Sequence, residues 1–144
     1  MAKRRTASTS TFGKNKSELS NDMHQLIYLA SPYSSDNKQV MQRRYEFNVA
    51  TVCDYLHKGI FLFSPIVHNH PVAQLRDLGR DWLFWKAYDE NFLARCDELW
   101  VLQLAGWHVS VGVQAEINFA LNRGMPVQYL TNEYTMESNS LAVW

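Results

Sequence analysis

The sequence lacks cysteines in metal-binding spacing, a long apolar run and a net charge, each of which would indicate a particular class of protein. It has only two cysteines, Cys53 and Cys96, and their spacing is not that of a metal site. Both lie in helical, apolar contexts, so we expect buried free thiols in a reducing cytoplasm. No stretch approaches the roughly 20 apolar residues that a membrane span needs. The net formal charge is zero, which gives no general attraction to nucleic acid or to a membrane surface.

The common phosphate-binding and metalloprotease motifs are also missing. The sequence contains no GxxxxGK[ST], no GxGxxG and no HExxH. His68 and His70 stand two residues apart, but His108 is the only nearby third candidate ligand. We therefore predict neither a metal ion nor a cofactor, and expect the histidine pair to line a pocket or the surface.

Positive charge is concentrated at the start of the chain. Five Lys and Arg residues fall within residues 1–16, separated mainly by Ser and Thr. The composition predicts a solvated tail over residues 1–22, followed by a single domain over residues 23–144. The tail lacks the apolar region of a secretory signal. A basic arm that contacts nucleic acid is an alternative, and it predicts binding that weakens steeply with salt.

Short apolar runs alternate with stretches of helical spacing after the tail. The runs predict strands at 25–30, 60–64, 97–104 and 126–130. The strands at 60–64 and 97–104 are expected to be buried. The spacing predicts helices at 36–57, 81–96 and 112–123, and a loop that starts at Pro65 and leads to a short helix. This order predicts an α/β sandwich with a parallel sheet of four to five strands.

In such folds ligands bind outside the carboxyl ends of the strands. Four loops are expected at that rim: residues 30–36, 64–70, 104–112 and 130 onward. In the first loop, Ser31 and Ser34 precede a helix N-terminus, where free backbone N–H groups attract anions or sugar hydroxyls. Helix capping is the alternative role for these serines.

Two carboxylates stand out among the acidic residues. We expect Glu116 in about the first turn of the helix after a central strand, where the helix dipole favours the ionised form by roughly 0.3–1 kcal/mol. An ionised carboxylate beside an anomeric carbon can act as a nucleophile, and Gly112 would let the backbone approach a ligand. Asp89 follows an aromatic stripe on its helix. Asp97 and Glu98 lie at a strand entrance, away from the rim, and are expected to be structural.

Four segments follow one another along the chain: IYLASPYSS, GIFLFSPIVHNHP, YDENFLARCDELWVL and SVGVQAEINFALNRGMPVQYL. Together they resemble the nucleoside 2-deoxyribosyltransferases and the related 2′-deoxynucleoside 5′-monophosphate N-glycosidases. The resemblance covers residues 24–131 and extends to small phage and bacterial proteins. It implies a flavodoxin-like three-layer sandwich, a cytoplasmic enzyme (phage-encoded ones acting in the host) and a homo-oligomer.

Carried over by position, the resemblance implies three catalytic residues. Glu116 matches the nucleophile that attacks C1′ and forms a covalent glycosyl-enzyme. Tyr28 matches the tyrosine that orients this carboxylate, and Asp89 matches the acid that helps proton transfer to the leaving base. The implied reaction is cleavage of an N-glycosidic bond, with either water or a second base accepting the sugar.

The resemblance also implies a substrate with a phosphate. Ser110 stands where the transferases carry an aspartate for the 5′-hydroxyl and the hydrolases carry a phosphate-binding serine. A serine can donate a hydrogen bond to phosphate, whereas an aspartate would repel it. Ser31 and Ser34 would complete the phosphate site, although Pro32 departs from the hydrolases' glycine-rich loop and removes one backbone donor. The residues expected to flank the nucleobase are His68, Trp85 and Trp107.

Two further expectations concern partners. The ligand is a small nucleoside or nucleotide, and a non-catalytic nucleotide-binding module on the same fold is the main alternative to an enzyme. An oligomer interface would suit exposed aromatic residues, with candidates at Trp82, Phe84 and Trp144.

Overall fold

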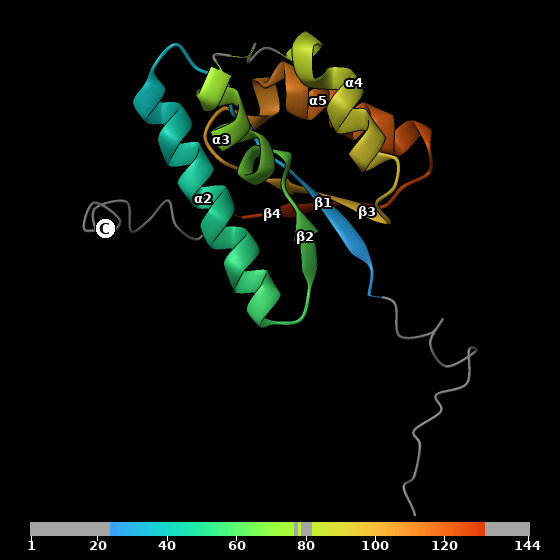
Figure 1. Ribbon diagram of the computed structural model, residues 1–144. Coiled ribbons are helices and arrows are strands. Elements are labelled where there is room, and N and C mark those ends of the chain that lie inside the picture. The colour runs from blue at the N-terminus through green and yellow to red at the C-terminus, as the bar shows by residue number, and fades with distance from the viewer. Residues whose placement is uncertain (1–23, 77, 79–81, 132–144) are drawn as a thin grey trace, which may run out of the picture.

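The structure of the chain is a computed structural model that describes residues 24–76, 78 and 82–131. The tail predicted at residues 1–22 and the polar residues after 131 lie outside this range. Strands and helices alternate along the described chain (Figure 1). The elements are β1 (Leu26–Ala30), α2 (Lys38–His57), β2 (Phe61–Phe63), α3 (Pro65–Arg76), α4 (Trp82–Leu93), β3 (Glu98–Leu102), the 3-10 helix η1 (Trp107–Val109), α5 (Val111–Asn122) and β4 (Val127–Leu130).

The four strands form one sheet in the order β2-β1-β3-β4, and every pair is parallel. In the register, Tyr28 of β1 lies between Phe63 of β2 and Leu99 of β3. The chain leaves β1 to build β2 on one side and later returns to build β3 on the other. The strand order therefore reverses between β1 and β3, which is where open α/β sheets form their ligand sites.

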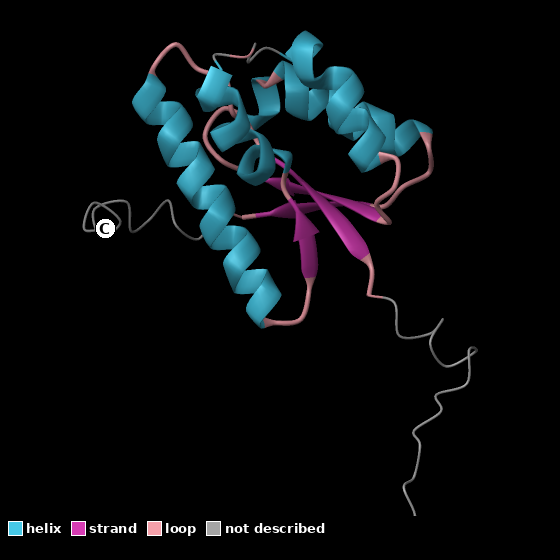
Figure 2. Cartoon of the chain, viewed as in Figure 1, coloured by secondary structure: helices cyan, strands magenta, loops and turns pink. Residues whose placement is uncertain are grey.

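Helices cover both faces of the sheet (Figure 2). Because side chains alternate along a strand, Ile27 and Leu29 pack toward α2, while Tyr28 and Ala30 pack toward α4 and α5. Each face has its own apolar cluster, and both are buried. The predicted α/β class with a parallel sheet is confirmed, and the layers are consistent with a flavodoxin-like three-layer sandwich.

Local signals explain the ends of α2. The side chain of Asn37 accepts a hydrogen bond from the backbone N–H of Gln39 at 2.9 Å, which caps the helix N-terminus. At the other end Gly59 has φ +74°, a conformation that residues with a Cβ adopt at a cost. The predicted helix 36–57 and its stop at Lys58–Gly59 are confirmed.

The predicted loop at Pro65 is wrong, because α3 begins there. Proline is favoured at the first helical position, and Oγ of Ser64 accepts a hydrogen bond from the N–H of Val67 at 3.2 Å, as a capping residue does. His68 and His70 therefore lie on a helix. The helix continues through Pro71 to Arg76.

Two expectations of burial are also corrected. The strand at 60–64 was expected to be buried, but β2 is an edge strand, and Phe61 is 40% exposed. Cys53 is exposed on α2, whereas Cys96 is buried as expected. Cys53 follows Val52, which packs against the sheet, so the helical turn of 100° per residue takes the thiol off that face.

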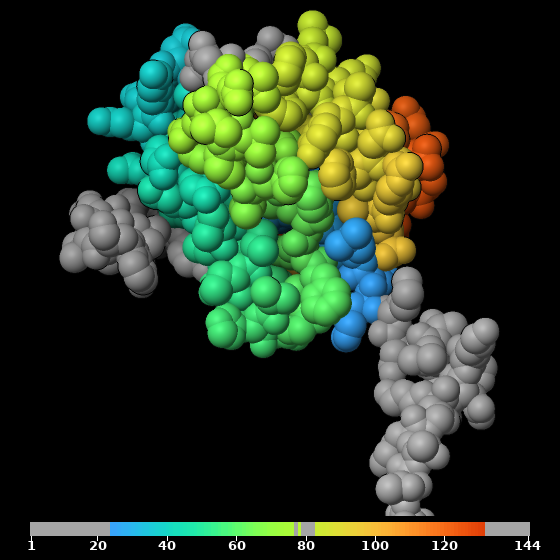
Figure 3. Space-filling view, in the orientation of Figure 1, coloured from blue at the N-terminus to red at the C-terminus, as the bar shows by residue number. Residues whose placement is uncertain are grey.

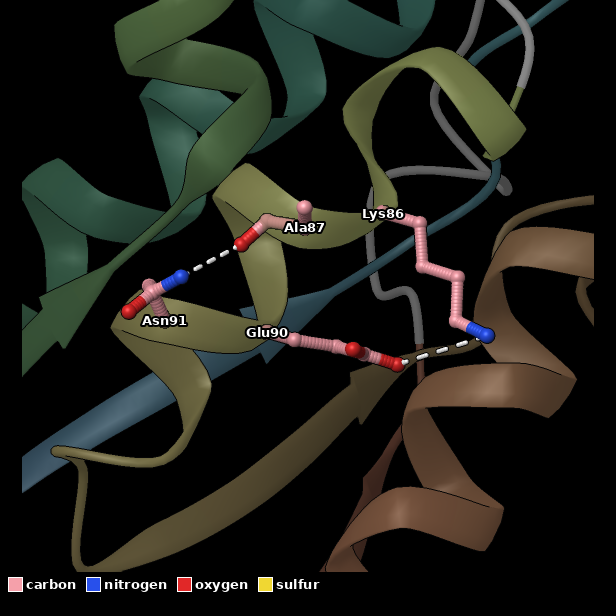
Figure 4. A network of polar contacts seen from close by, with 4 residues as sticks. All are labelled: Lys86, Ala87, Glu90 and Asn91. Atoms are coloured by element: carbon pink, nitrogen blue, oxygen red, sulfur yellow. Dashed lines mark hydrogen bonds and ion pairs between the residues drawn. The ribbon is translucent and has the colours of Figure 1, made fainter.

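The outer side of α4 carries short polar contacts between residues four apart. Nζ of Lys86 lies 3.9 Å from Oε1 of Glu90, and Nδ2 of Asn91 donates to the carbonyl of Ala87 at 2.7 Å (Figure 4). Exposed pairs of this kind contribute little stability, typically about 0.3–0.5 kcal/mol. The helix is shorter than the predicted 81–96, and Asp81, which could cap its N-terminus, lies outside the described residues. In Figure 3, α2, α3 and α4 cover most of the visible face.

Asp97 and Glu98 have the structural roles expected of them. Oδ2 of Asp97 accepts from the N–H of Leu26 at 2.8 Å, which ties the start of β3 to the start of β1. Oε2 of Glu98 accepts from the indole N–H of Trp100 at 2.9 Å. Among the helices within the described range, none is long and apolar enough to cross a membrane.

Candidate active site

A pocket of about 450 Å³ opens at the carboxyl edge of the sheet. Its walls come from residues 31–34 after β1, the first turns of α3, Trp85 and Asp89 of α4, and residues 109–113 before and within α5. Three of the four predicted rim loops therefore meet at one site. The fourth, which follows β4, lies almost wholly outside the described residues.

Glu116 lines this pocket, and its hydrogen-bond partner is Tyr28 of β1. The phenol O–H of Tyr28 donates to Oε1 of Glu116 over 2.6 Å. Tyr28 is fully buried and Glu116 is 5% exposed. The contact joins residues 88 positions apart, because the alternation of β1 turns Tyr28 toward the face that α5 covers.

Glu116 differs from the expectation in its position and its charge. It lies in the second turn of α5, six residues after the cap at Ser110, so the first turn contains no acid. Burial raises the pKa of its carboxyl to about 8, although the Tyr28 hydrogen bond lowers it, and the negative charge of Asp89 raises it further. At pH 7 the protonated form predominates, because desolvation outweighs any effect of the helix dipole.

Asp89 is the second buried acid of the site. It is 8% exposed, and burial raises its pKa to about 7, while a hydrogen bond from Nδ2 of Asn69 at 3.2 Å lowers it. Because the charge of Asp89 acts on Glu116, the two carboxyls titrate as a coupled pair near neutral pH. Burial and the same two acids raise the pKa of Tyr28 well above its usual value, so this phenol keeps its proton.

The predicted phosphate-binding residues line the pocket. Ser31 is 8% exposed, and its Oγ accepts a hydrogen bond from Nδ2 of Asn48 at 2.7 Å. Ser34 lies on the same loop. Ser110 caps α5, since its Oγ accepts from the N–H of Val113 at 3.4 Å, and Gly112 lies in the first turn of that helix.

The three residues expected to flank a base are placed differently. Trp85 lines the pocket, whereas His68 and Trp107 do not. His68 is exposed on α3 against Tyr88 and Phe92, and Trp107 packs against Tyr129 with ring centroids 5.5 Å apart. These two placements follow from the earlier start of α3 and from the 3-10 turn, neither of which the sequence interpretation included.

The face that α3 turns to the pocket carries His70, which the sequence analysis expected to line a pocket or the surface. It also carries residues that the sequence analysis missed, which recur at helical spacing and are Pro65, Ile66, Asn69 and Ala73. His70 is buried in a polar cluster: its Nδ1 lies 2.7 Å from the hydroxyl of Tyr33, and the ring of Tyr45 stacks on it at 4.2 Å. A helical interpretation of 65–76 would have identified Asn69 and His70.

Arg44 is the other residue that sequence reasoning missed. Its guanidinium donates to the carbonyls of Tyr33, Ser34 and Ala105 at 3.1, 2.9 and 3.3 Å, and so joins the loops after β1 and β3. Within the described part of the chain it pairs with no carboxylate. Arg44 lines the pocket, and its positive charge is bound by carbonyl oxygens rather than by a carboxylate. Its place four residues before the buried Asn48 on α2 was the available signal.

A group of three or more His, Cys, Asp or Glu side chains that could hold a metal ion does not occur among the described residues. His68 and His70 point to different surroundings, as described above. The chemistry that the site can perform rests on two coupled acids, a phenol and a cationic rim.

These features define an α/β domain with two buried acids at the switch point of a parallel sheet. Residues 25–132 match the model of a family described as a domain of unknown function (DUF1937). The match spans most of the chain, and the chain belongs to this family. The comparison with curated proteins gives no match.

Proposed function

We propose that the protein cleaves the N-glycosidic bond of a (deoxy)nucleoside 5′-monophosphate in the cytoplasm. The observation that carries this proposal is the 2.6 Å hydrogen bond between Tyr28 and Glu116 at the base of a pocket that Asp89 also lines. A buried, oriented carboxyl beside a second acid is the arrangement that a retaining glycosidic reaction needs. The pocket volume of about 450 Å³ suits a ligand of nucleotide size.

The reaction proceeds in two displacements. The ionised Oε2 of Glu116 attacks C1′, the C1′–N bond breaks, and its electron pair leaves with the base, which takes a proton from Asp89. In the second step water attacks C1′ and displaces Glu116, while Asp89 accepts the proton from that water. The products are the free base and the sugar phosphate. If a second base attacks instead of water, the product is a new nucleotide.

The protonation states limit the rate of this reaction. The reactive form has Glu116 ionised and Asp89 protonated, whereas the pKa values of about 8 and about 7 favour the opposite distribution. A difference of one pKa unit makes the reactive form about a tenth as abundant as its tautomer.

The rim of the pocket supports a phosphate group on the substrate. The unpaired charge of Arg44, the hydroxyl of Ser110 and the N-terminal N–H groups of α5 all lie along it. Among the described side chains, none accepts the proton of the Ser31 hydroxyl, so that group can donate to a ligand. Positive and donor groups at the rim and acids at the base match the two ends of a nucleotide.

The test is a panel of nucleosides and 5′-monophosphates scored for free base by chromatography. We expect base release from a monophosphate, and a drop of at least 100-fold in Glu116→Gln, which removes the nucleophile but keeps an acceptor for Tyr28. Intact mass after rapid quenching should reveal a glycosyl adduct on Glu116. Glu46→Gln, a change at an exposed acid, is the matched control. Assays with an added free base separate hydrolysis from transfer.

A non-catalytic nucleotide-binding module is the second candidate. The observation in its favour is that Glu116 is mainly protonated at pH 7 and could then donate a hydrogen bond to a ligand without attacking it. This alternative predicts calorimetric binding of a nucleotide with no base release over hours. It also predicts that Glu116→Gln binds as tightly as the wild type.

A further inference from the structure

A chain of three side chains leads from the surface of α3 to Asp89. Nδ1 of His68 lies 2.9 Å from Oδ1 of Asn69, and Nδ2 of Asn69 donates to Oδ1 of Asp89 at 3.2 Å. Asn69 is 8% exposed and lines the pocket, whereas His68 is exposed. The hydroxyl of Tyr88 lies 3.3 Å from the same nitrogen of His68.

The two hydrogen bonds among His68, Asn69 and Asp89 run in one donor-to-acceptor direction. A primary amide accepts only at its oxygen and donates only at its nitrogen. Because Oδ1 of Asn69 faces His68, Nδ1 of that imidazole must carry a hydrogen. The amide nitrogen then faces Asp89. A reversed amide would put its oxygen against a carboxylate oxygen, which is repulsive when Asp89 is ionised.

The hydrogen bond also distinguishes the two oxygens of Asp89. Oδ1 is occupied by an N–H donor, so a proton on this carboxyl resides on Oδ2. Within the described residues, Asn69 provides the one side-chain hydrogen bond to Asp89. Tyr28 donates to Glu116 instead.

We propose that Asn69 is a positioning residue for Asp89, and that its amide, oriented by His68, keeps Oδ2 free to carry the proton given to the leaving base. The role of that proton rests on the proposed function, but the coupling of Asn69 to Asp89 does not. The proposal also gives His68 a role other than contact with a base, since it acts through Asn69 from outside the pocket.

The other groups that face Asp89 act differently. Glu116 on α5 and Tyr28 on β1 are the titratable neighbours, and the charge of Asp89 raises the pKa of both. His70 on α3 and Arg44 on α2 line the same pocket. Among the described side chains, the Asn69 amide alone donates a hydrogen bond to the carboxylate, and this bond favours its ionised form. Loss of the amide should therefore raise the pKa of Asp89.

The direct test follows the carboxyl carbon of Asp89 by NMR across pH, which needs no activity. In Asn69→Leu, a change of similar size without a donor, we expect the titration midpoint to rise by about one pH unit. His68→Ala should raise it by less, since the amide remains but is no longer held. His68→Asn, which keeps an N–H near the position of Nδ1, should restore the wild-type midpoint. Asn91→Leu, at an exposed amide on α4, is the matched control.

The activity test uses the same variants. In Asn69→Leu the alkaline limb of kcat/KM should move up with the NMR midpoint. The higher pKa of Asp89 alone would make the reactive form more abundant, so a fall of kcat with little change of KM reports the lost positioning of Oδ2. An unchanged or lowered midpoint in Asn69→Leu overturns the proposal. If that variant does not fold, the exposed site His68→Ala decides, and an unchanged midpoint there overturns it equally. A shifted midpoint in a protein that releases no base would instead overturn the proposed function and leave the coupling intact.

Discussion

At the scale of single residues, the site is costly to maintain. Glu116 and Asp89 are buried, and both have raised pKa values, so their ionised forms are destabilised by the fold. A protein that needed only stability would carry apolar or amide side chains here. Two such acids in one pocket are typical of a functional site, where strain is retained for chemistry.

This cost predicts a pH-dependent gain of stability in Glu116→Gln. The folded pKa of about 8 lies above the usual value of 4.5, so between these two pH values the unfolded chain releases a proton that the folded chain keeps. Wild-type stability therefore falls as pH rises from about 4.5 to about 8, whereas the glutamine contributes no such loss. The free energy of unfolding of the variant minus that of the wild type should be larger at pH 9 than at pH 4, by on the order of a few kcal/mol.

Urea unfolding of both proteins at pH 4, 7 and 9 measures this gain. Glu46→Gln removes an exposed acid from α2 and should show no comparable trend. A difference between Glu116→Gln and the wild type that stays constant across pH would contradict the burial argument.

The same pair predicts the pH dependence of catalysis. Below the pKa of the pair Glu116 is protonated and does not attack, and above it Asp89 has no proton to give. A bell-shaped profile of kcat/KM is therefore expected, with its maximum between about pH 7 and about pH 8. In Asp89→Asn the remaining limb should report Glu116 alone, with a midpoint below about 8 because Glu116 loses a negative neighbour, and the alkaline limb should disappear. A Glu116 midpoint that stays at about 8 would show that Asp89 does not act on Glu116.

At the scale of elements, local patterns located most of the fold. Alternating apolar runs and helical spacing placed all four strands and three helices, because both faces of the sheet and one face of each helix are buried. They failed at α3, where the segment from Pro65 was interpreted as a loop leading to a short helix, although Ser64 and Pro65 are good helix-start residues. That failure placed His68 at the pocket and left out Asn69.

Ser110 at the N-terminus of α5 caps the helix and, in the proposed function, binds the substrate phosphate. Substitutions of this residue should separate the two roles. Ser110→Asp keeps a strong capping side chain, so the stability of α5 should be preserved, whereas Ser110→Ala should cost about 1 kcal/mol. The added negative charge at the rim should raise KM for a 5′-monophosphate at least tenfold and leave the matching nucleoside nearly unaffected. Steady-state kinetics on the two substrates, with thermal unfolding of each variant, measure both effects. Equal losses on both substrates would remove Ser110 from the phosphate site.

At the scale of the whole molecule, the site joins residues that no local pattern connects. Tyr28, Asp89 and Glu116 come from β1, α4 and α5, and the crossover that puts β3 beside β1 brings them together. The sequence indicated this group only through a family resemblance that spans residues 24–131. Arg44 and Asn69 were not found, because their roles depend on side-chain directions that neither spacing nor resemblance provided.

The surface beside the pocket predicts association of two copies of the chain. Leu83 is 81% exposed, and Val109 and Val111 are each 71% exposed, although the last two border the open side of the pocket. Exposed apolar residues that cluster at the edge of a pocket are typical of an interface. We expect light scattering to give the mass of at least a dimer for the wild type. Val111→Asp should shift this mass toward that of the monomer. The substitution should also raise KM, because a partner subunit that covers this edge limits the access of solvent to the site. Leu121→Asp, a change at an exposed leucine near the far end of α5, should leave the mass unchanged. A wild-type protein that stays monomeric at high concentration would mean that one chain forms the whole site.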